Sequence, residues 1–348
     1  MRFPVRTRRI RKALLAALVS VAANATAAKA EGEVNLYSSR HYDTDERLYS
    51  DFTKHTGIKV NRIEGKADEL IERMRAEGAN SPADVLLTVD TTRLERAKDA
   101  GVLQPAKSAV LEERIPANLQ DRDDEWFGFS QRARIVFYDK ADVAEPPRTY
   151  LDLADKKYRG QVCSRSSTNV YSQTLLAAII ENHGADKARE WASGVVENFA
   201  REPQGGDTDQ LRALVSGECD VSVSNTYYFA RALRTDVKGL GADEIAGIGW
   251  VFPKMTETAG AHVNLSGGGV ARHAPNRENA VRFLEYLASD QAQVYFSAGN
   301  DEYPAVPGVE RSESVEKLGA LDADPVNLSN VAKRVAEAQA IFAQVGWK

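Results

Sequence analysis

Cysteine, histidine and the motifs of common enzymes are scarce in this sequence. The 348 residues include two cysteines, Cys163 and Cys219, and five histidines. The cysteines stand too far apart for a C-x-x-C zinc or thioredoxin motif. There is no G-x-S-x-G or H-E-x-x-H motif, and the glycines of "LSGGGVA" lack the lysine and the spacing of a phosphate-binding loop. Hydrolysis by serine or zinc and phosphate binding therefore have no motif in their favour.

Long apolar runs are missing after the first thirty residues. Residues 1–30 begin with a basic segment, continue with "ALLAALVSVAANATA" and end at Ala28-Lys29-Ala30, which fits a small-residue cleavage site. We therefore predict a signal peptide over residues 1–30 and an exported protein. Thr7-Arg8-Arg9 also fits a twin-arginine export signal, although a basic segment often contains such pairs.

The mature chain is acidic. The signal peptide holds seven basic and no acidic residues, so its removal lowers the formal net charge from −5 to −12, since 38 basic residues then face 50 acidic ones. Such a protein is a poor binder of nucleic acid. No later segment approaches the roughly 18 apolar residues of a membrane span, so none is expected in the mature chain. An even cysteine pair in an oxidising compartment predicts a disulfide between Cys163 and Cys219.

Strand and helix signals alternate along the mature chain, which favours an α/β fold with a largely parallel sheet. Hydrophobic periodicity predicts strands at 33–39, 58–63, 83–89, 160–169 and 218–225, and helices at 45–57, 67–78, 91–101, 172–184 and 206–217. The extended segments 126–140 and 247–270 indicate two crossings between two lobes. We expect residues 31–128 with 252–302 in the first lobe and residues 129–251 with 303–348 in the second.

Tyrosines follow three of the predicted strands, each where a helix begins. His41-Tyr42 follows the first strand, Tyr171 follows the fourth, and Tyr227-Tyr228 follows the fifth. In open α/β sheets the ligand crevice lies beyond the carboxyl ends of the strands, so these side chains are expected to converge on one cleft. Adjacent residues on the first turn of a helix are about 100° apart and can reach one ligand.

Four phenols and an imidazole suit a hard trivalent cation. A phenol, with a pKa of about 10, ionises near neutrality only beside a strong Lewis acid, and ferric iron is such an acid. Zinc and copper prefer cysteine and histidine, and calcium prefers carboxylate-rich loops. Two alternatives stay open at this point. Each tyrosine is an ordinary core or rim residue, or the rings form an aromatic cleft for a polyamine or a sugar.

Two further groups of polar residues are expected to have structural roles. Asp207 or Thr208 is predicted to cap the helix over residues 206–217. The other histidines are expected to be solvated or to cap helices, and we exclude them as ligands: His55, His183, His262 and His273.

Six segments resemble the ferric-iron-binding proteins of bacterial ABC iron importers: "LYSSRHYDTD", "EGKADELIERMRAEGANSPADVLLTVD", "WFGFSQRARIVFYDK", "PQGGDTDQ", "GECDVSVSNTYY" and "NDEYPAVPGV". They occur in the family's order and span essentially the whole mature chain. The resemblance implies an α/β, two-lobed periplasmic binding protein fold of type 2, with a wound, mostly parallel sheet and flanking helices in each lobe and hinge strands between them. It also implies a periplasmic location and Fe(III) bound in the cleft between the lobes.

Carried over by motif, the implied iron ligands are Tyr171, Tyr227 and Tyr228 from the second lobe, and Tyr42 with His41 from the first. "SSRHYD" resembles the members that complete the iron shell with protein ligands rather than with an anion such as carbonate. The implied partners of this monomeric, non-enzymatic binder are an inner-membrane ABC permease and its ATPase. The alternatives are the same fold serving an organic solute such as a polyamine or thiamine, and a secreted enzyme.

Charge balance adds an expectation about arginines. Fe(III) with four phenolates carries a net charge of −1, so a nearby guanidinium is favourable. The candidates are Arg40, Arg132 and Arg165, of which the last two lie in family-like motifs near the crossing and near Tyr171. The alternative for each is an ordinary surface salt bridge.

Overall fold

The computed structural model describes residue 1, residues 32–40 and residues 42–348. The predicted signal peptide lies outside these ranges apart from Met1, and so does His41. Within the described residues, no helix is both long and apolar enough to cross a membrane.

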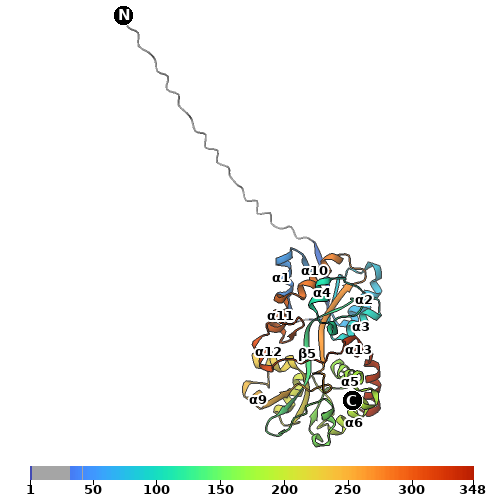
Figure 1. Cartoon of the computed structure of the whole chain (residues 1–348), viewed down its shortest axis with the longest axis vertical. Helices are drawn as coiled ribbons and strands as arrows, with labels where there is room; N and C mark the ends of the chain where they lie inside the picture. Colours follow the sequence, from blue (N-terminus) through green and yellow to red (C-terminus); the bar gives the residue numbers. More distant parts are fainter. Residues whose placement is uncertain (2–31, 41) are drawn as a thin grey trace.

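The described chain forms two halves, one above the other in Figure 1, and strand β5 (Phe127–Asp139) runs between them. The upper half contains β1 (Glu33–Ser38), β2 (Lys59–Glu64), β3 (Val85–Val89), β4 (Leu103–Gln104), α1 (Glu46–Thr56), α2 (Ala67–Glu77), α3 (Thr91–Asp99), α4 (Ala109–Arg114), α10 (Arg277–Leu287) and α11 (Asp290–Asn300). The predicted two-lobed α/β architecture is confirmed, while the exact lobe boundaries stay a prediction.

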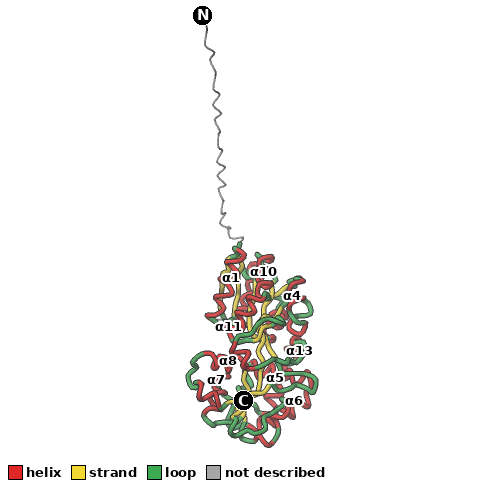
Figure 2. The backbone as a smooth tube through the Cα atoms, turned by 60° about the vertical axis from the view of Figure 1, so that its left-hand side comes forward, coloured by secondary structure: helices red, strands yellow, loops and turns green. Residues whose placement is uncertain are grey.

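The lower half is built mainly from the middle of the chain. It contains β6 (Val162–Cys163), β7 (Val221–Asn225), β8 (Ile248–Val251), α5 (Val170–His183), α6 (Ala185–Asn198), α7 (Asp207–Val215), α8 (Thr226–Arg234), α9 (Ala242–Ala246), α12 (Glu313–Leu318) and α14 (Val335–Val345). Helix α13 (Leu328–Lys333) packs against α3 of the upper half and α5 of the lower half. Figure 2 shows α13 between the two halves.

The sheet is mixed rather than mostly parallel. Strand β1 is parallel to β2 and β3, and β6 is parallel to β7. Strand β9 (Val263–Ala271) is antiparallel to β3 and β5, and β5 is antiparallel to β7 and β8. The reason is that β5 carries the chain down to the lower half and β9 carries it back. Residues 127–133 of β5 pair with β9, and residues 134–139 pair with β7 and β8.

The glycines of β9 allow the strands of the upper half to pack closely. A Cβ atom on Gly267 would lie 2.4 Å from the carbonyl oxygen of Phe127, and one on Gly269 would lie 2.1 Å from that of Glu125. These distances are too short for any side chain. The "SGGGV" segment is therefore part of a strand packed closely between β3 and β5 and is not a phosphate-binding loop.

Local sequence signals place most element ends correctly, with two corrections. Helix α1 ends at Thr56, and the predicted stop, Gly57, is its C-cap: it has a left-handed φ of 73° and donates its N–H to the Thr53 carbonyl. The predicted strand over 160–169 is shorter in the structure, where only Val162–Cys163 forms β6. Asn169, at the end of the predicted strand, is instead the N-cap of α5, and its side chain accepts from the backbone N–H of Tyr171. The N-cap of α7 is Gly206 rather than Asp207 or Thr208.

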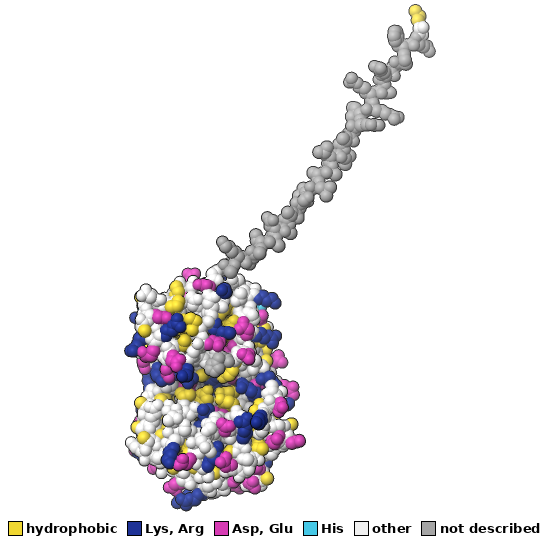
Figure 3. All heavy atoms as spheres, turned by 180° about the vertical axis from the view of Figure 1, so that it is seen from behind, with side chains coloured by type: hydrophobic (Ala, Val, Ile, Leu, Met, Phe, Trp, Pro, Cys, Tyr) yellow, Lys and Arg dark blue, Asp and Glu magenta, His cyan; other side chains and the backbone are white. Residues whose placement is uncertain are grey.

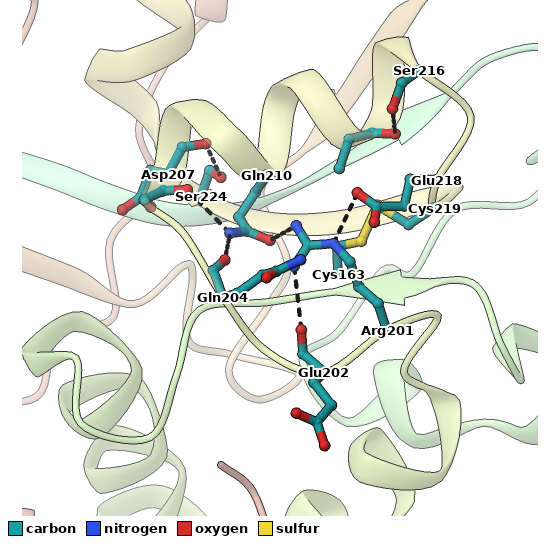
Figure 4. The surroundings of a disulfide bond; sticks show 12 residues. Cys163, Arg201, Glu202, Gln204, Asp207, Gln210, Ser216, Glu218, Cys219 and Ser224 are labelled. Atoms are coloured by element: carbon teal, nitrogen blue, oxygen red, sulfur yellow. Dashed lines mark hydrogen bonds and ion pairs between the residues drawn. A yellow bond between two sulfur atoms is a disulfide. The ribbon is translucent and has the colours of Figure 1, made fainter.

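The predicted disulfide is confirmed. Cys163 at the end of β6 is bonded to Cys219, which lies just before the neighbouring strand β7, and 56 residues separate the two cysteines. Figure 4 shows Arg201 beside this bond, with its Nε 2.9 Å from a carboxylate oxygen of Glu218. The disulfide therefore ties together the two strands that lead toward Tyr171 and Tyr227.

Loss of the disulfide is expected to destabilise the lower half. Replacing both cysteines, Cys163→Ser with Cys219→Ser, should lower the free energy of unfolding by about 2–4 kcal/mol, because the unfolded chain regains the freedom of a long closed loop. Urea unfolding monitored by circular dichroism measures this, and the double variant should not respond to a reductant. Equal unfolding midpoints for oxidised and reduced wild-type protein would contradict the expectation.

Candidate metal centre

The four predicted tyrosines line one cavity. Tyr42, Tyr171, Tyr227 and Tyr228 all face a cavity of about 810 Å³ at the junction of the two halves. Figure 3 shows a groove across the waist of the molecule in which side chains of the hydrophobic class, in yellow, lie beside lysines and arginines, in dark blue. The convergence expected from the strand-to-helix positions is therefore seen in the structure.

Each tyrosine stands at the beginning of a helix. Tyr42 is the N-cap residue of a short 3-10 helix over Asp43–Asp45, which leads into α1. Tyr171 is the second residue of α5, and Tyr227 and Tyr228 lie in the first turn of α8. The partial positive charge of a helix N-terminus favours negative oxygens nearby.

The phenols are held close to one another and away from water. The ring centres of Tyr227 and Tyr228 are 4.2 Å apart. Burial raises the pKa of Tyr227 well above its ordinary value, and the neighbouring phenols of Tyr171 and Tyr228 raise it further. Burial also raises the pKa of Tyr42 and of Tyr228. These phenols therefore stay protonated near neutrality until a cation displaces their protons.

Arg132 brings a buried positive charge to the tyrosines. Its Nη2 donates to Glu302 Oε1 and to Ser266 Oγ, both at 2.5 Å, and its Cζ lies 5.8 Å from the ring centre of Tyr227. Its Nε and Nη1 are buried without a hydrogen-bond partner among the described residues. Burial alone would lower the pKa of Arg132, but Glu302, Tyr171 and Tyr227 raise it. The arginine therefore stays charged, with donors left for additional negative oxygens.

Arg40 is also buried, so the surface-pair alternative is wrong for both Arg40 and Arg132. The Nε of Arg40 donates to Asp45 at 2.8 Å, and its Nη1 lies 3.4 Å from Glu302. Its Cζ is 5.0 Å from the ring centre of Tyr42. Glu302 thus lies between two guanidinium groups. Although burial would raise the pKa of Glu302, Arg132 and Arg40 lower it, so the carboxylate is ionised.

Asp207 anchors a second pair of arginines. Its carboxylate is fully buried and accepts from Arg134 Nη1 at 2.7 Å, from the backbone N–H of Asn225 at 2.9 Å, and from Arg165 Nη1. Arg165 lies with its Cζ 5.6 Å from the ring centre of Tyr171. Asp207 therefore ties Arg165 to the residue that precedes α8. Its role is ionic, which its position in the helix-cap pattern did not reveal.

The histidines that the sequence excludes as ligands do not line the tyrosine cavity. His55 is exposed, and His183 Nε2 lies 2.7 Å from the Met255 carbonyl oxygen. The expectation of a solvated or capping role is wrong for His262, which is fully buried. Burial and the nearby Arg134 lower the pKa of His262 to about 3, so it is neutral near pH 7.

Two residues near the tyrosines are absent from the predicted site. One is Glu302, which belongs to the "NDEYPAVPGV" segment. It was not predicted because nothing in a cation site made of phenolates gives a reason to expect a further acid. Arg231 is the other, with its Cζ 5.9 Å from the ring centre of Tyr227. Its position one helical turn after Tyr227 and Tyr228 is the signal that could have identified it.

This donor set is suited to a hard cation. The cavity lining supplies four phenolic oxygens, and it also includes the carboxylates of Glu64, Asp68 and Glu69 from β2 and α2. No group of three or more His, Cys, Asp or Glu side chains that could hold a metal ion occurs among the described residues. Phenolate oxygens bind a trivalent cation strongly, and the buried arginines offset the negative charge that such ligands accumulate.

The fold and the arrangement of the cavity define a two-lobed solute-binding protein. The chain belongs to the family of bacterial extracellular solute-binding proteins, since the sequence pattern of that family matches residues 47–323 of this chain. One curated relative, iron uptake protein A1 from Synechocystis sp., is 49% identical over 318 residues, which cover 91% of this chain and 88% of the relative.

Solved structures show the same fold. FutA (IdiA) from Trichodesmium, in complex with iron and citrate ligands, is 50% identical with a TM-score of 0.87, and the match covers 91% of this chain and 100% of that one. The ferric binding protein from Campylobacter jejuni is 39% identical with a TM-score of 0.82, over 90% of this chain and 100% of that one. The predicted periplasmic binding protein fold is therefore confirmed.

Removing the charge of Glu302 is expected to destabilise the junction of the two halves. Glu302→Gln should lower the free energy of unfolding by about 3–5 kcal/mol, because it leaves the buried guanidinium of Arg132 without its carboxylate, while Arg40 keeps Asp45. Glu181→Gln, which removes an ion pair with Arg334 at the surface, is the control and should cost about 0–1 kcal/mol.

The same carboxylate predicts a pH dependence. Since its folded-state pKa is lowered, its contribution to stability is present above the ordinary glutamate pKa of about 4.3 and is lost as the pH falls through the folded value. Urea unfolding of the wild type and of Glu302→Gln between neutral and acidic pH measures this loss of stability. A Glu302→Gln variant as stable as the wild type at pH 7 would contradict the ionic role.

Proposed function

We propose that this protein captures Fe(III) between its lobes in the periplasm and delivers it to an inner-membrane ABC permease and its ATPase for iron uptake. The phenolates of Tyr42, Tyr171, Tyr227 and Tyr228 are the proposed ligands. The observation that carries the proposal is that these four tyrosines, from three distant segments, line one cavity. The proposal extends to this chain what the names of its relatives say of them.

His41 is the proposed fifth ligand. It lies outside the described residues, and the proposal rests on its place directly before Tyr42. In this proposal, the lobe closure that brings Tyr42 to Tyr171 and Tyr227 also brings His41 to the ion. The protein then acts as a hinged, monomeric binder, with signal peptide 1–30 removed on export.

Charge balance supports iron over the alternatives. Fe(III) with four phenolates has a net charge of −1, and Arg132 offers two nitrogens, Nε and Nη1, that have no hydrogen-bond partner among the described residues and lie near these rings. The charges of Arg40 and Arg165 also lie beside tyrosine rings, so a cationic polyamine would meet positive charge at these rings. The carboxylates of the cavity lining, Glu64, Asp68 and Glu69, come instead from β2 and α2. Membership of the solute-binding family supports a binder rather than a secreted enzyme.

Iron binding through phenolates is expected to colour the protein. Charge transfer from phenolate to Fe(III) gives a visible absorption band, so Tyr227→Phe should weaken this band and raise the dissociation constant by at least about a hundredfold, since a charged ligand to the metal is lost. Tyr286→Phe is the matched control, because Tyr286 lies in α10 outside the cavity lining.

The measurement is a visible spectrum with metal analysis of both variants and the wild type. An unchanged band in Tyr227→Phe would remove this residue from the ligand set. A colourless, iron-free wild type after incubation with ferric citrate would contradict the proposed function itself.

Iron retention should fall as the pH drops. Each phenol that binds as phenolate releases one proton, and the raised pKa values of Tyr42, Tyr227 and Tyr228 keep these groups protonated without the metal. The apparent affinity should therefore fall about tenfold per pH unit for each such phenol. Competition with a chelator of known affinity across a pH series measures the slope, and a flat profile would count against phenolate ligation.

A further inference from the structure

A buried carboxylate at the end of α11 is held by side chains from the lower half of the molecule. Asp301 follows α11 directly and is fully buried. Its two oxygens accept from Nε and Nη2 of Arg234, both at 2.8 Å, and Ser314 Oγ donates to it at 2.8 Å. The Nε of Arg231 lies 3.7 Å away. A bidentate arginine pair of this kind is among the stronger ionic contacts in proteins.

The partners of Asp301 belong to the helix that carries two of the tyrosines. Arg234 is the last residue of α8 and lies two helical turns after Tyr227. Ser314 lies in α12, which packs against α8. Figure 2 shows α8 directly below α11, so the Asp301–Arg234 pair joins the tyrosine helix of the lower half to the upper half.

The residue before Asp301 holds the other tyrosine-bearing segment. Asn300 donates from Nδ2 to Asp45 Oδ1 at 2.8 Å and accepts from Thr44 Oγ1 at 2.5 Å. Thr44 and Asp45 directly follow Tyr42 and its neighbour in the chain. A single turn of backbone therefore connects the segment of Tyr42 with the helix of Tyr227 and Tyr228.

The backbone at this turn is constrained. Asp301 has a φ of 60°, in the left-handed region, which aspartate tolerates better than most residues at a modest cost. This conformation is what turns the carboxylate from the end of α11 toward α8. The pair thus depends on a specific backbone geometry as well as on charge.

We propose that Asp301 and Arg234 form a latch between the lobes that slows iron release by tying the end of α8 to the turn that follows α11. This inference rests on the proposed iron binding. Both are positioning residues, since neither lines the tyrosine cavity. The Arg234 side chain is 37% exposed, so its charge returns to water at little cost when the lobes part. Opening the latch therefore costs less than separating a fully buried pair.

Removing the latch should speed iron release without changing the iron ligands. In the full-length mature protein loaded with iron, Arg234→Met keeps much of the side-chain volume and loses the charge. Iron release to excess chelator, followed as loss of the visible band, should be about tenfold faster than in the wild type. The wavelength of the band should be unchanged. Arg334→Met, which removes the surface pair with Glu181, is the matched control and should release iron at the wild-type rate.

A double-mutant cycle tests whether the pair itself is responsible. Asp301→Asn should also speed release, and adding Arg234→Met to it should have little further effect. Arg234→Lys, which keeps the charge but not the bidentate geometry, should give an intermediate rate. If Asp301→Asn does not fold, the two Arg234 variants and the control still decide the question.

The latch is overturned by a wild-type release rate in Arg234→Met, by a shifted band that reports altered ligands, or by a loss of thermal stability with unchanged release. It is also overturned if the two substitutions act additively. These results are distinct from failure of the proposed function, which would appear as the absence of an iron-dependent band from the wild type and would remove the latch with it.

Discussion

Four phenol groups share one cavity, and the balance of charge around them governs the rest of the structure. Burial raises the pKa of at least three of these phenols, so their oxygens become negative only when a strong cation arrives. The resulting excess of negative charge has to be offset nearby. Arg132 meets this need with two buried nitrogens, Nε and Nη1, that lack partners among the described residues, while Glu302 holds its remaining nitrogen in place.

One strand connects this charge balance with both halves of the molecule. Ser130, Arg132 and Arg134 alternate along β5, so they share one face of the strand that joins the two halves. The first two contact Glu302 beside the upper half, and Arg134 contacts Asp207 in the lower half. The strand that links the two halves thus also carries the arginines that pair with both buried carboxylates, Glu302 and Asp207.

Local patterns predicted the tyrosine cavity but not its ionic support. The position of Tyr171 and Tyr227 directly after predicted strands was enough to predict that they share a cavity, because the ends of such strands meet at one edge of a sheet. Strand direction is not encoded in periodicity, so the antiparallel course of β5 and β9 was missed. The partners of Glu302 and Asp207 lie far away in sequence, at Arg132 and Arg134, and no local pattern reveals pairs of this kind.

The central claim is that phenol oxygens from both lobes contact one ferric ion. An anomalous difference map collected at the iron absorption edge from crystals of the iron-loaded protein tests it most directly. The account predicts one strong peak per chain in contact with the hydroxyl oxygens of Tyr42, Tyr171, Tyr227 and Tyr228. A peak at carboxylates elsewhere on the molecule, with these four hydroxyl groups not coordinating metal, would contradict it.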